Sequence, residues 1–302
     1  MKAPPVGMNH LSALRFLLVA ALGGLSFPMV KMSLEGLTPA QLVFGRLLLG
    51  AVVLLVIAGL RGTGLPRFGR VWGHLVVAAA LGNVLPFTLL SYGERTTDAG
   101  VAGVLVGSTP LLTLVLTAVV VRTEPATRRK AIGLVVGFLG LVIVLNPWDK
   151  AFGSLSGQLA CLGAALCYAA YFAYIRMYLW PLGLAPVALI AGQLCVATLL
   201  QAPAALFLGG APPAVTGRVA ISVVLLGLLC TGLGYVQLFR LIGEVGATTA
   251  SAVNYLEPVF AAVISTALFG EPITATMLVG GLVLLAGVAY AENRLRFPGE
   301  VR

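Results

Sequence analysis

Charged residues are scarce in this chain: they make up 10% of its 302 residues, while 59% are hydrophobic. An ordinary soluble domain has about 25% charged residues and 45–50% apolar ones. A shortage of this size leaves too few charged side chains to cover a water-soluble surface of ordinary extent. The composition therefore excludes a typical soluble protein and leaves almost no chain for a separate soluble domain.

Residues that commonly catalyse reactions or bind metals are also few. The chain has two histidines, His10 and His74, both near the ends of apolar runs, and four cysteines without the C-x-x-C spacing of a metal site. It contains no H-x-x-E-H motif, no nucleophile elbow and no phosphate-binding loop. We therefore expect no metal, no cofactor and no direct use of ATP, and an intramembrane enzyme remains only a remote alternative.

Long apolar runs, in contrast, recur along the whole sequence. A run of about 20 mostly apolar residues can cross a hydrocarbon core of roughly 30 Å as a helix. The predicted spans are 11–31, 39–60, 71–92, 98–121, 129–146, 156–178, 185–207, 217–240, 247–269 and 273–291. The sequence therefore predicts an all-α polytopic membrane protein with ten transmembrane helices.

The basic residues predict how these helices are oriented. The net charge of +9 comes largely from short clusters at the ends of apolar runs, and most clusters share one side if the N-terminus is cytoplasmic. Cytoplasmic connections of membrane proteins are enriched in lysine and arginine. Membrane topology therefore explains the charge better than nucleic-acid binding does. We expect a multi-pass protein of the cell inner membrane with both termini in the cytoplasm.

The two halves of the sequence are similar to each other. Pro110 aligns with Pro258, and with one gap Gly140 aligns with Gly287, so that the offset stays near 147 residues. Such an offset is typical of an internal repeat. We therefore predict two copies of one five-helix unit, residues 1–147 and residues 148–302.

An odd number of helices in each copy determines how the copies are inserted. If the first copy enters the membrane from the cytoplasm, the second must enter from outside. The repeats are then inverted, an architecture that suits alternating access because the two halves can exchange conformations. We expect the site at the interface of the halves, near mid-membrane.

The segment SAVNYLEPVF, residues 251–260, places polar groups in the middle of an apolar run. Glu257 lies about 15 Å along its span at 1.5 Å per residue, close to the membrane midplane. Ser251, Asn254 and Glu257 share one helix face because they are three residues apart. An ionisable group at this depth is costly in lipid, so it faces a cavity or a partner.

Two interpretations of this face remain open. In the first, Asn254 and Glu257 line a substrate path, where Glu257 attracts an ammonium group or carries a coupling proton. In the second, Glu257 is protonated or hydrogen-bonded between helices and only fixes their packing.

Further residues are candidates for the lining of the same path. Arg46 lies about two turns into its span and aligns with Gln193 of the second half. It either holds a substrate carboxylate or an outer gate, or is a structural partner for a helix C-terminus or a side chain that extends to the membrane surface. Tyr168 and Tyr171 belong to a tyrosine stripe whose rings can stack on a substrate. The remaining candidates are Asn83, Tyr92 and Tyr235.

Several sequence blocks resemble one known family. The second half carries YLEPVFAAVISTALFGEPIT followed by GGLVLLAGV, the first half carries TEPAT and GLVVGFLGLVIV, and GGLSFPMVKMSLEGLTPAQLVFGRLLLGA lies near the start. Together these blocks resemble the EamA-type transporters of the drug/metabolite transporter (DMT) superfamily over essentially the whole chain. One local departure is Arg122, which stands where the second half has Gly270.

The resemblance implies ten helices around central cavities and export of small metabolites, often amino acids. Within the family we hypothesise a YddG-like amino-acid exporter, a group of which some members handle aromatic amino acids. A multidrug or cationic-compound exporter of the same superfamily is the alternative. The expected partners are a small-molecule substrate and membrane lipid, and the choice between a monomer and a weak dimer stays open.

Overall fold

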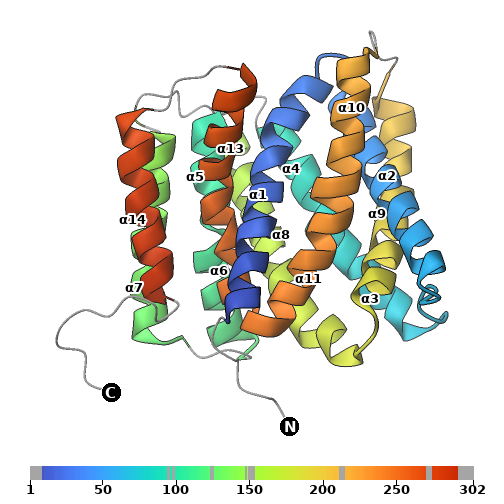
Figure 1. Cartoon of the computed structure of the whole chain (residues 1–302), viewed down its shortest axis with the longest axis horizontal. Coiled ribbons are helices and arrows are strands. Elements are labelled where there is room, and N and C mark those ends of the chain that lie inside the picture. The colour runs from blue at the N-terminus through green and yellow to red at the C-terminus, as the bar shows by residue number, and fades with distance from the viewer. Residues whose placement is uncertain are drawn as a thin grey trace.

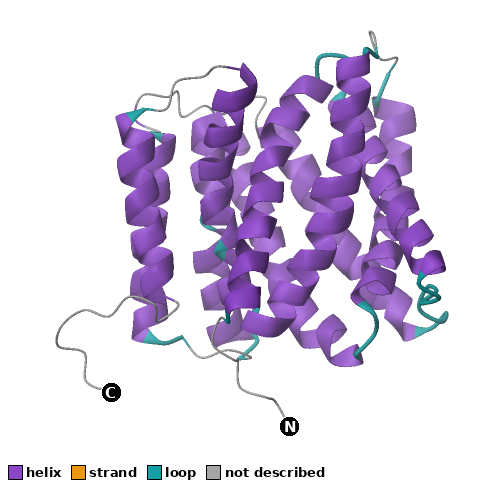
Figure 2. Ribbon diagram, viewed as in Figure 1, coloured by secondary structure: helices purple, strands orange, loops and turns teal. Residues whose placement is uncertain are grey.

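The computed structural model describes residues 9–93, 96, 99–122, 126–146, 148, 154–210, 215–269 and 274–291, and the regular elements in these ranges are all helical (Figure 2). The first repeat contains α1 (His10–Ser33), α2 (Pro39–Leu60), α3–η1–α4 (Arg70–Ala79, Ala80–Val84, Leu85–Gly93), α5–α6–η2 (Ala99–Gly107, Thr109–Val115, Leu116–Val120) and α7 (Arg128–Leu145). The second contains α8–η4–η5 (Leu155–Tyr174, Ile175–Leu179, Trp180–Leu182), α9 (Pro186–Leu208), α10–η6–α11 (Gly217–Leu225, Leu226–Leu233, Gly234–Val245), α12–α13 (Ala247–Ser251, Val253–Phe269) and α14 (Ala275–Ala291).

These segments confirm the predicted spans in number and order. Eight of the helical stretches are at least 18 residues long and apolar enough to cross a membrane, and α14 is a shorter apolar helix. The largest difference at an end concerns the span predicted to stop at residue 240, which continues to Val245. Ala252 breaks the span that contains Glu257 into α12 and α13, a break that the sequence did not predict.

Local sequence explains where several helices begin. Asn9 and Ser154 accept hydrogen bonds from the backbone N–H groups of Ser12 and Gly157, which caps α1 and α8. Pro39 and Pro186, which align in the two repeats, are the first residues of α2 and α9. Proline suits this position because its missing N–H has no helical partner there.

The two repeats run through the bundle in opposite directions. α1 begins and α14 ends at the lower edge of the bundle in Figure 1. α8 begins at the upper edge, where Ser154 Oγ donates a hydrogen bond to Thr96 Oγ1 just beyond the end of α4, at 2.7 Å. The first helix of each repeat is therefore inverted relative to the other, as the odd number of helices predicts.

The first helix of each repeat packs mainly against the opposite repeat. α1 contacts α10, α11 and α13, whereas α8 contacts α4, α5 and α6. α2 packs against α9, and α7 against α14, so each of these pairs joins equivalent helices. This arrangement interleaves the repeats and brings side chains from both into the centre of the bundle.

The α7–α14 pair is a seam of glycines. A Cβ atom built at Gly280 would lie 2.6 Å from the backbone nitrogen of Val144, and one at Gly133 would lie 2.6 Å from Ala291 Cβ. A Cβ atom built at Gly287 would likewise meet the backbone of Gly137. Glycines of this kind let membrane helices approach until their backbones touch.

Two π-helical segments occupy equivalent places in the repeats. η1, residues 80–84, maps onto residues 227–231 of η6 with the offset of 147 found in the sequence. A π-turn leaves the regular i→i−4 ladder and is frequent at functional sites. Both segments lie at mid-helix, where the candidate site is found.

Candidate functional site

Arg46 is buried in the middle of the bundle although it carries a charge. Its side chain is 9% exposed. Its Nε atom donates a hydrogen bond to Thr231 Oγ1 in η6 at 3.1 Å, and its guanidinium carbon lies 4.8 Å from the centre of the Phe87 ring. One hydroxyl and one aromatic face leave most of the guanidinium N–H groups available, since arginine has five donors.

Glu257 approaches the same region from α13. Its side chain packs directly onto Gly23 of α1, at a place where any side chain larger than hydrogen would overlap the carboxyl group. It interacts electrostatically with Arg46. Among the described residues, no ion pair joins these two side chains and no hydrogen bond reaches the Glu257 carboxylate. An arginine and a carboxyl group from opposite repeats thus lie near each other without forming an ion pair.

Tyrosines complete this central cluster, which we define as Arg46, Tyr168, Tyr235 and Glu257. Both tyrosines lie close enough to Arg46 and Glu257 for these two groups to influence their phenol rings. The Tyr235 hydroxyl donates a hydrogen bond to the Gly82 carbonyl oxygen of η1 at 2.8 Å. Tyr168, Tyr235 and Glu257 are all half-buried rather than fully buried, so that part of each side chain remains accessible.

A second polar group lies beside the central cluster. Gln193 Nε2 donates hydrogen bonds to Asn83 Oδ1 at 2.9 Å and to the Tyr171 hydroxyl at 3.1 Å. The Tyr171 and Tyr235 rings meet edge-on with their centres 6.2 Å apart. Asn83 is fully buried, and its Nδ2 has no hydrogen-bond partner in the described ranges. A buried amide with a free donor is able to bind a further acceptor.

The two polar contacts follow the inverted symmetry of the fold. Arg46 of α2 binds Thr231 of η6, and Gln193 of α9 binds Asn83 of η1. Arg46 aligns with Gln193, and η6 aligns with η1. Each π-turn is therefore held by the second helix of the opposite repeat. The offset between the repeats was the signal that pointed to Gln193, which was not among the predicted site residues.

The remaining predicted residues lie at different distances from this centre. Asn254 is half-buried one turn before Glu257. Ser251 is fully buried, and its hydroxyl donates to the Thr248 carbonyl oxygen of its own helix at 2.8 Å. Tyr92 is 53% exposed near the end of α4. The structure thus brings together Arg46, Tyr168, Tyr235 and Glu257, sets Asn83 and Tyr171 beside them, and does not bring Tyr92 to them.

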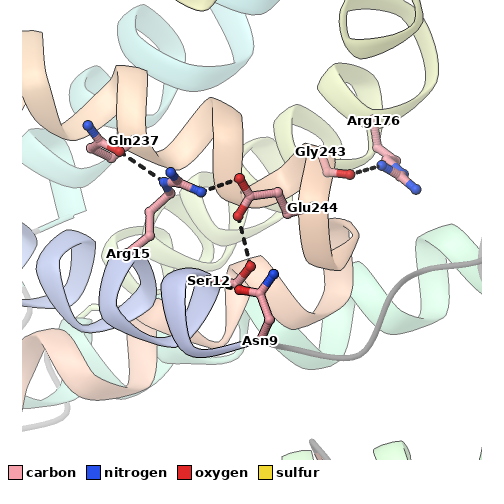
Figure 3. Close-up of polar contacts among 7 residues, drawn as sticks. All are labelled: Asn9, Ser12, Arg15, Arg176, Gln237, Gly243 and Glu244. Carbon is pink, nitrogen blue, oxygen red and sulfur yellow. Dashed lines mark hydrogen bonds and ion pairs between the residues drawn. The ribbon is translucent and has the colours of Figure 1, made fainter.

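A second set of charges joins the repeats at the lower edge of the bundle (Figure 3). We call Ser12, Arg15, Gln237 and Glu244 the α1–α11 cluster. Arg15 forms an ion pair with Glu244, and its Nε donates to Gln237 Oε1 at 3.0 Å. Ser12 Oγ donates to Glu244 Oε2 at 2.9 Å. Arg15 and Glu244 are only 11% and 32% exposed, so the pair ties α1 to α11 in a partly buried setting.

A neighbouring contact strengthens the same edge. Arg176 of η4 donates a hydrogen bond to the Gly243 carbonyl oxygen near the end of α11 (Figure 3). The last turn of α11 is therefore held by α1 on one side and by η4 on the other. The lower edge thus holds polar contacts between the repeats, through α1 and α11, and within the second repeat, through η4 and α11.

The side chains gathered at the centre offer several ways to bind a ligand. The described part of the chain holds no group of three or more His, Cys, Asp or Glu side chains that would bind a metal. The central cluster instead offers a cation, a carboxylate and aromatic rings from α2, α8, α11 and α13. A molecule that carries opposite charges and an apolar part would match all three.

In the described ranges, ten helical segments form two interleaved, inverted repeats around a polar centre, an arrangement found in many membrane transporters. The EamA-like transporter family matches residues 10–146 and, separately, residues 155–291. The chain therefore belongs to the EamA-like transporter family of the DMT superfamily. The two matches correspond to the two repeats.

Individual relatives agree with this family. The chain is 31% identical over 287 residues to the "Uncharacterized transporter YdfC" of Bacillus subtilis (strain 168), covering 94% of this chain and 92% of the relative. It is 29% identical over 271 residues to a "Probable terminal-alkyne amino-acid exporter" of Streptantibioticus cattleyicolor, covering 89% of each. A solved structure titled "Crystal structure of protein" has a TM-score of 0.79 and 17% identity, covers 93% of this chain and 96% of its own, and supports the fold.

Proposed function

We propose that this protein exports amino acids or similar small amphiphilic metabolites across the cell inner membrane by alternating access between the repeats 1–147 and 148–302. The observation that carries this proposal is the central cluster: Arg46 and Glu257 come from opposite repeats and interact electrostatically. Within the described ranges, no ion pair consumes either charge. The relative named as a terminal-alkyne amino-acid exporter supports the same substrate class.

In this proposal each charge binds one end of the substrate. The free N–H groups of Arg46 bind the carboxylate, since a guanidinium matches the geometry of a carboxylate. Glu257 binds the ammonium, and the rings of Tyr168 and Tyr235 pack against the side chain. Asn83 adds its free amide donor, while Asn254 lines the path one turn from Glu257. Tyr171 positions Gln193. Ser251 serves in helix packing, and Tyr92 lies at the membrane boundary; neither contacts the substrate.

The α1–α11 cluster closes one end of the path in this scheme. With both termini in the cytoplasm, as the distribution of basic residues indicates, the closed lower edge is the cytoplasmic one. Arg15 and Glu244 must separate before a substrate enters from the cytoplasm. Transport then alternates between the state with this edge closed and a state with it open.

A cationic-compound exporter is the second candidate, because Glu257 and the tyrosines alone would suit an organic cation. Arg46 distinguishes the candidates, since a cation gains nothing from a second positive charge. Purified protein in liposomes is tested with a panel of radiolabelled amino acids and with cationic dyes, with and without a proton gradient. Uptake of amino acids that is lost in Arg46→Gln supports the proposal. Uptake of dyes alone, unchanged or increased in Arg46→Gln, overturns it.

A further inference from the structure

A narrow groove opens between α2, α9 and the η6–α11 segment, away from the central cluster. Its volume is about 130 Å³. Arg61, Arg240 and Gln237 contribute polar groups, and Val53, Ile57 and Leu233 are among the apolar residues that line it. Arg61 follows the last residue of α2, and Val187 of the lining lies in the first turn of α9. The groove therefore reaches the lower edge of the bundle.

The groove runs along the helices rather than across them. Its lining extends on α2 from Val53 to Arg61 and on the other wall from Leu228 to Arg240. At 1.5 Å per residue these stretches span about 12 Å and 18 Å. The charged groups lie at the end nearer the membrane surface, and the rest of the lining is apolar apart from Gln237. This polarity matches a molecule with an anionic head and a hydrocarbon chain.

The two arginines at this end are available to bind such a head. Within the described ranges, neither Arg61 nor Arg240 has an ion pair or a side-chain hydrogen bond. Two guanidinium groups at one opening match a phosphate, which accepts several hydrogen bonds at once. Basic pockets between transmembrane helices on the cytoplasmic side are suited to acidic lipid headgroups.

We propose that this groove is a binding site for an anionic phospholipid of the bilayer, with one acyl chain between α2, α9 and α11 and the phosphate between Arg61 and Arg240. A free phosphate would use the arginines but leave the apolar walls uncovered, so the complete site fits a lipid. The proposal stands on the groove itself and does not depend on which substrate the central cluster carries.

A bound lipid would also touch the contact that closes the lower edge. Gln237 lines the groove and accepts the hydrogen bond from Arg15 Nε at 3.0 Å. A chain wedged against α11 restrains the helix that carries Glu244. Occupancy of the groove is therefore expected to favour the state in which the α1–α11 cluster is intact.

The test measures lipid binding without measuring transport. Detergent-purified protein is titrated with phosphatidylglycerol, with phosphatidylcholine of the same acyl chains and with inorganic phosphate, and bound lipid is counted by native mass spectrometry alongside thermal unfolding. We expect phosphatidylglycerol alone to remain bound and to raise the unfolding temperature. The double variant Arg61→Gln/Arg240→Gln is expected to weaken this binding about 100-fold, because loss of each charged hydrogen bond to the phosphate costs about tenfold.

Matched variants make the outcome decisive. Arg70→Gln removes an exposed arginine from the same edge outside the groove lining, and it should leave lipid binding unchanged. Ile57→Trp narrows the apolar part and should reduce binding while both arginines remain. Equal retention of the two lipids, an equal effect of inorganic phosphate, or undiminished binding in the arginine double variant would each overturn the proposal.

Discussion

Two arginine–glutamate combinations join the first repeat to the second, and the structure holds them in different ways. At the lower edge, Arg15 and Glu244 form an ion pair that Ser12 and Gln237 complete. At the centre, Arg46 is bound by Thr231 instead. Glu257 rests against Gly23, and no ion pair links it to Arg46 within the part of the chain that the structure describes.

The difference indicates two tasks for the same pair of residue types. Two charged side chains that form an ion pair hold their helices together, and a ligand would stabilise them little further. Charges that are kept apart in a buried place are costly in themselves, because removal from water is only repaid by a good partner. The central pair is therefore stabilised most when a ligand supplies the missing partners. The pair at the edge is stabilised most when Arg15 and Glu244 stay in contact.

The largest effect is expected from removal of the central cation. Arg46→Gln should lower the transport efficiency, Vmax/KM, by about 100-fold. Loss of each charged hydrogen bond to a carboxylate costs roughly 1.5–3 kcal/mol. Concentration-dependent uptake into liposomes measures this effect. Thr231→Val is the matched control, because it removes the Arg46 contact and keeps the charge, and it should cost far less. Equal losses in both variants would contradict a role for the charge in binding.

Exchange of charges distinguishes the two combinations directly. Arg15→Glu should reduce transport by about tenfold through a repulsive pair, and Arg15→Glu/Glu244→Arg should recover most of the loss, because a paired contact tolerates reversal. Arg46→Glu/Glu257→Arg should stay inactive, because in the proposed binding mode each of the two side chains contacts a different end of the substrate. Uptake rates of the single and double variants give one double-mutant cycle for Arg15 and Glu244 and another for Arg46 and Glu257. Recovery at the centre would show that Arg46 and Glu257 act only on each other.

Weakening the ion pair at the edge should change which side is open. Glu244→Gln removes a partly buried pair, and about 1 kcal/mol corresponds to roughly a fivefold shift between the two states. Asn254→Cys, in a background without the four native cysteines, reports on this shift through labelling by a membrane-impermeant thiol reagent. Labelling from the side of the α1–α11 cluster should rise about fivefold. An unchanged rate would mean that the cluster does not control entry.

The smallest effect on transport is expected at the residue that aligns with Arg46. Gln193→Leu leaves Asn83 Oδ1 without its donor, which should lower stability by about 1–3 kcal/mol and transport by less than threefold. Thermal unfolding and uptake measure the two effects. The variant Gln193→Asn, which keeps an amide on a shorter side chain, serves as the polar control. A loss as large as that of Arg46→Gln would mean that both halves bind substrate equivalently.

Much of the fold could be predicted because its signals are local. Helix length, apolar composition and the offset between halves are properties of short segments, and they predicted ten helices in two inverted repeats. Arg46 and Glu257 were found for the same reason, since a charge in an apolar run is conspicuous wherever its helix packs.

The partners of these residues could not be predicted, because they depend on how the helices interleave. Nothing near Arg15 in the sequence indicates Glu244, and the contact arises only because α1 packs against the opposite repeat. For Ser251 the sequence predicted a position but not a partner. Its spacing placed it on the same face as Glu257, but its hydroxyl donates to a carbonyl oxygen of its own helix. The break at Ala252 also puts Ser251 and Glu257 on two different helices, α12 and α13.

The glycine seam between α7 and α14 has a mechanical consequence. With Gly280 against the backbone of Val144, and Gly137 against Gly287, a slide of one helix along the other would drive the neighbouring side chains into the opposing main chain. We therefore expect α7 and α14 to stay fixed relative to each other during transport, while the helices that carry Arg46 and Glu257 move relative to this pair. The last helix of each repeat would then stay in place while the other helices of the bundle move.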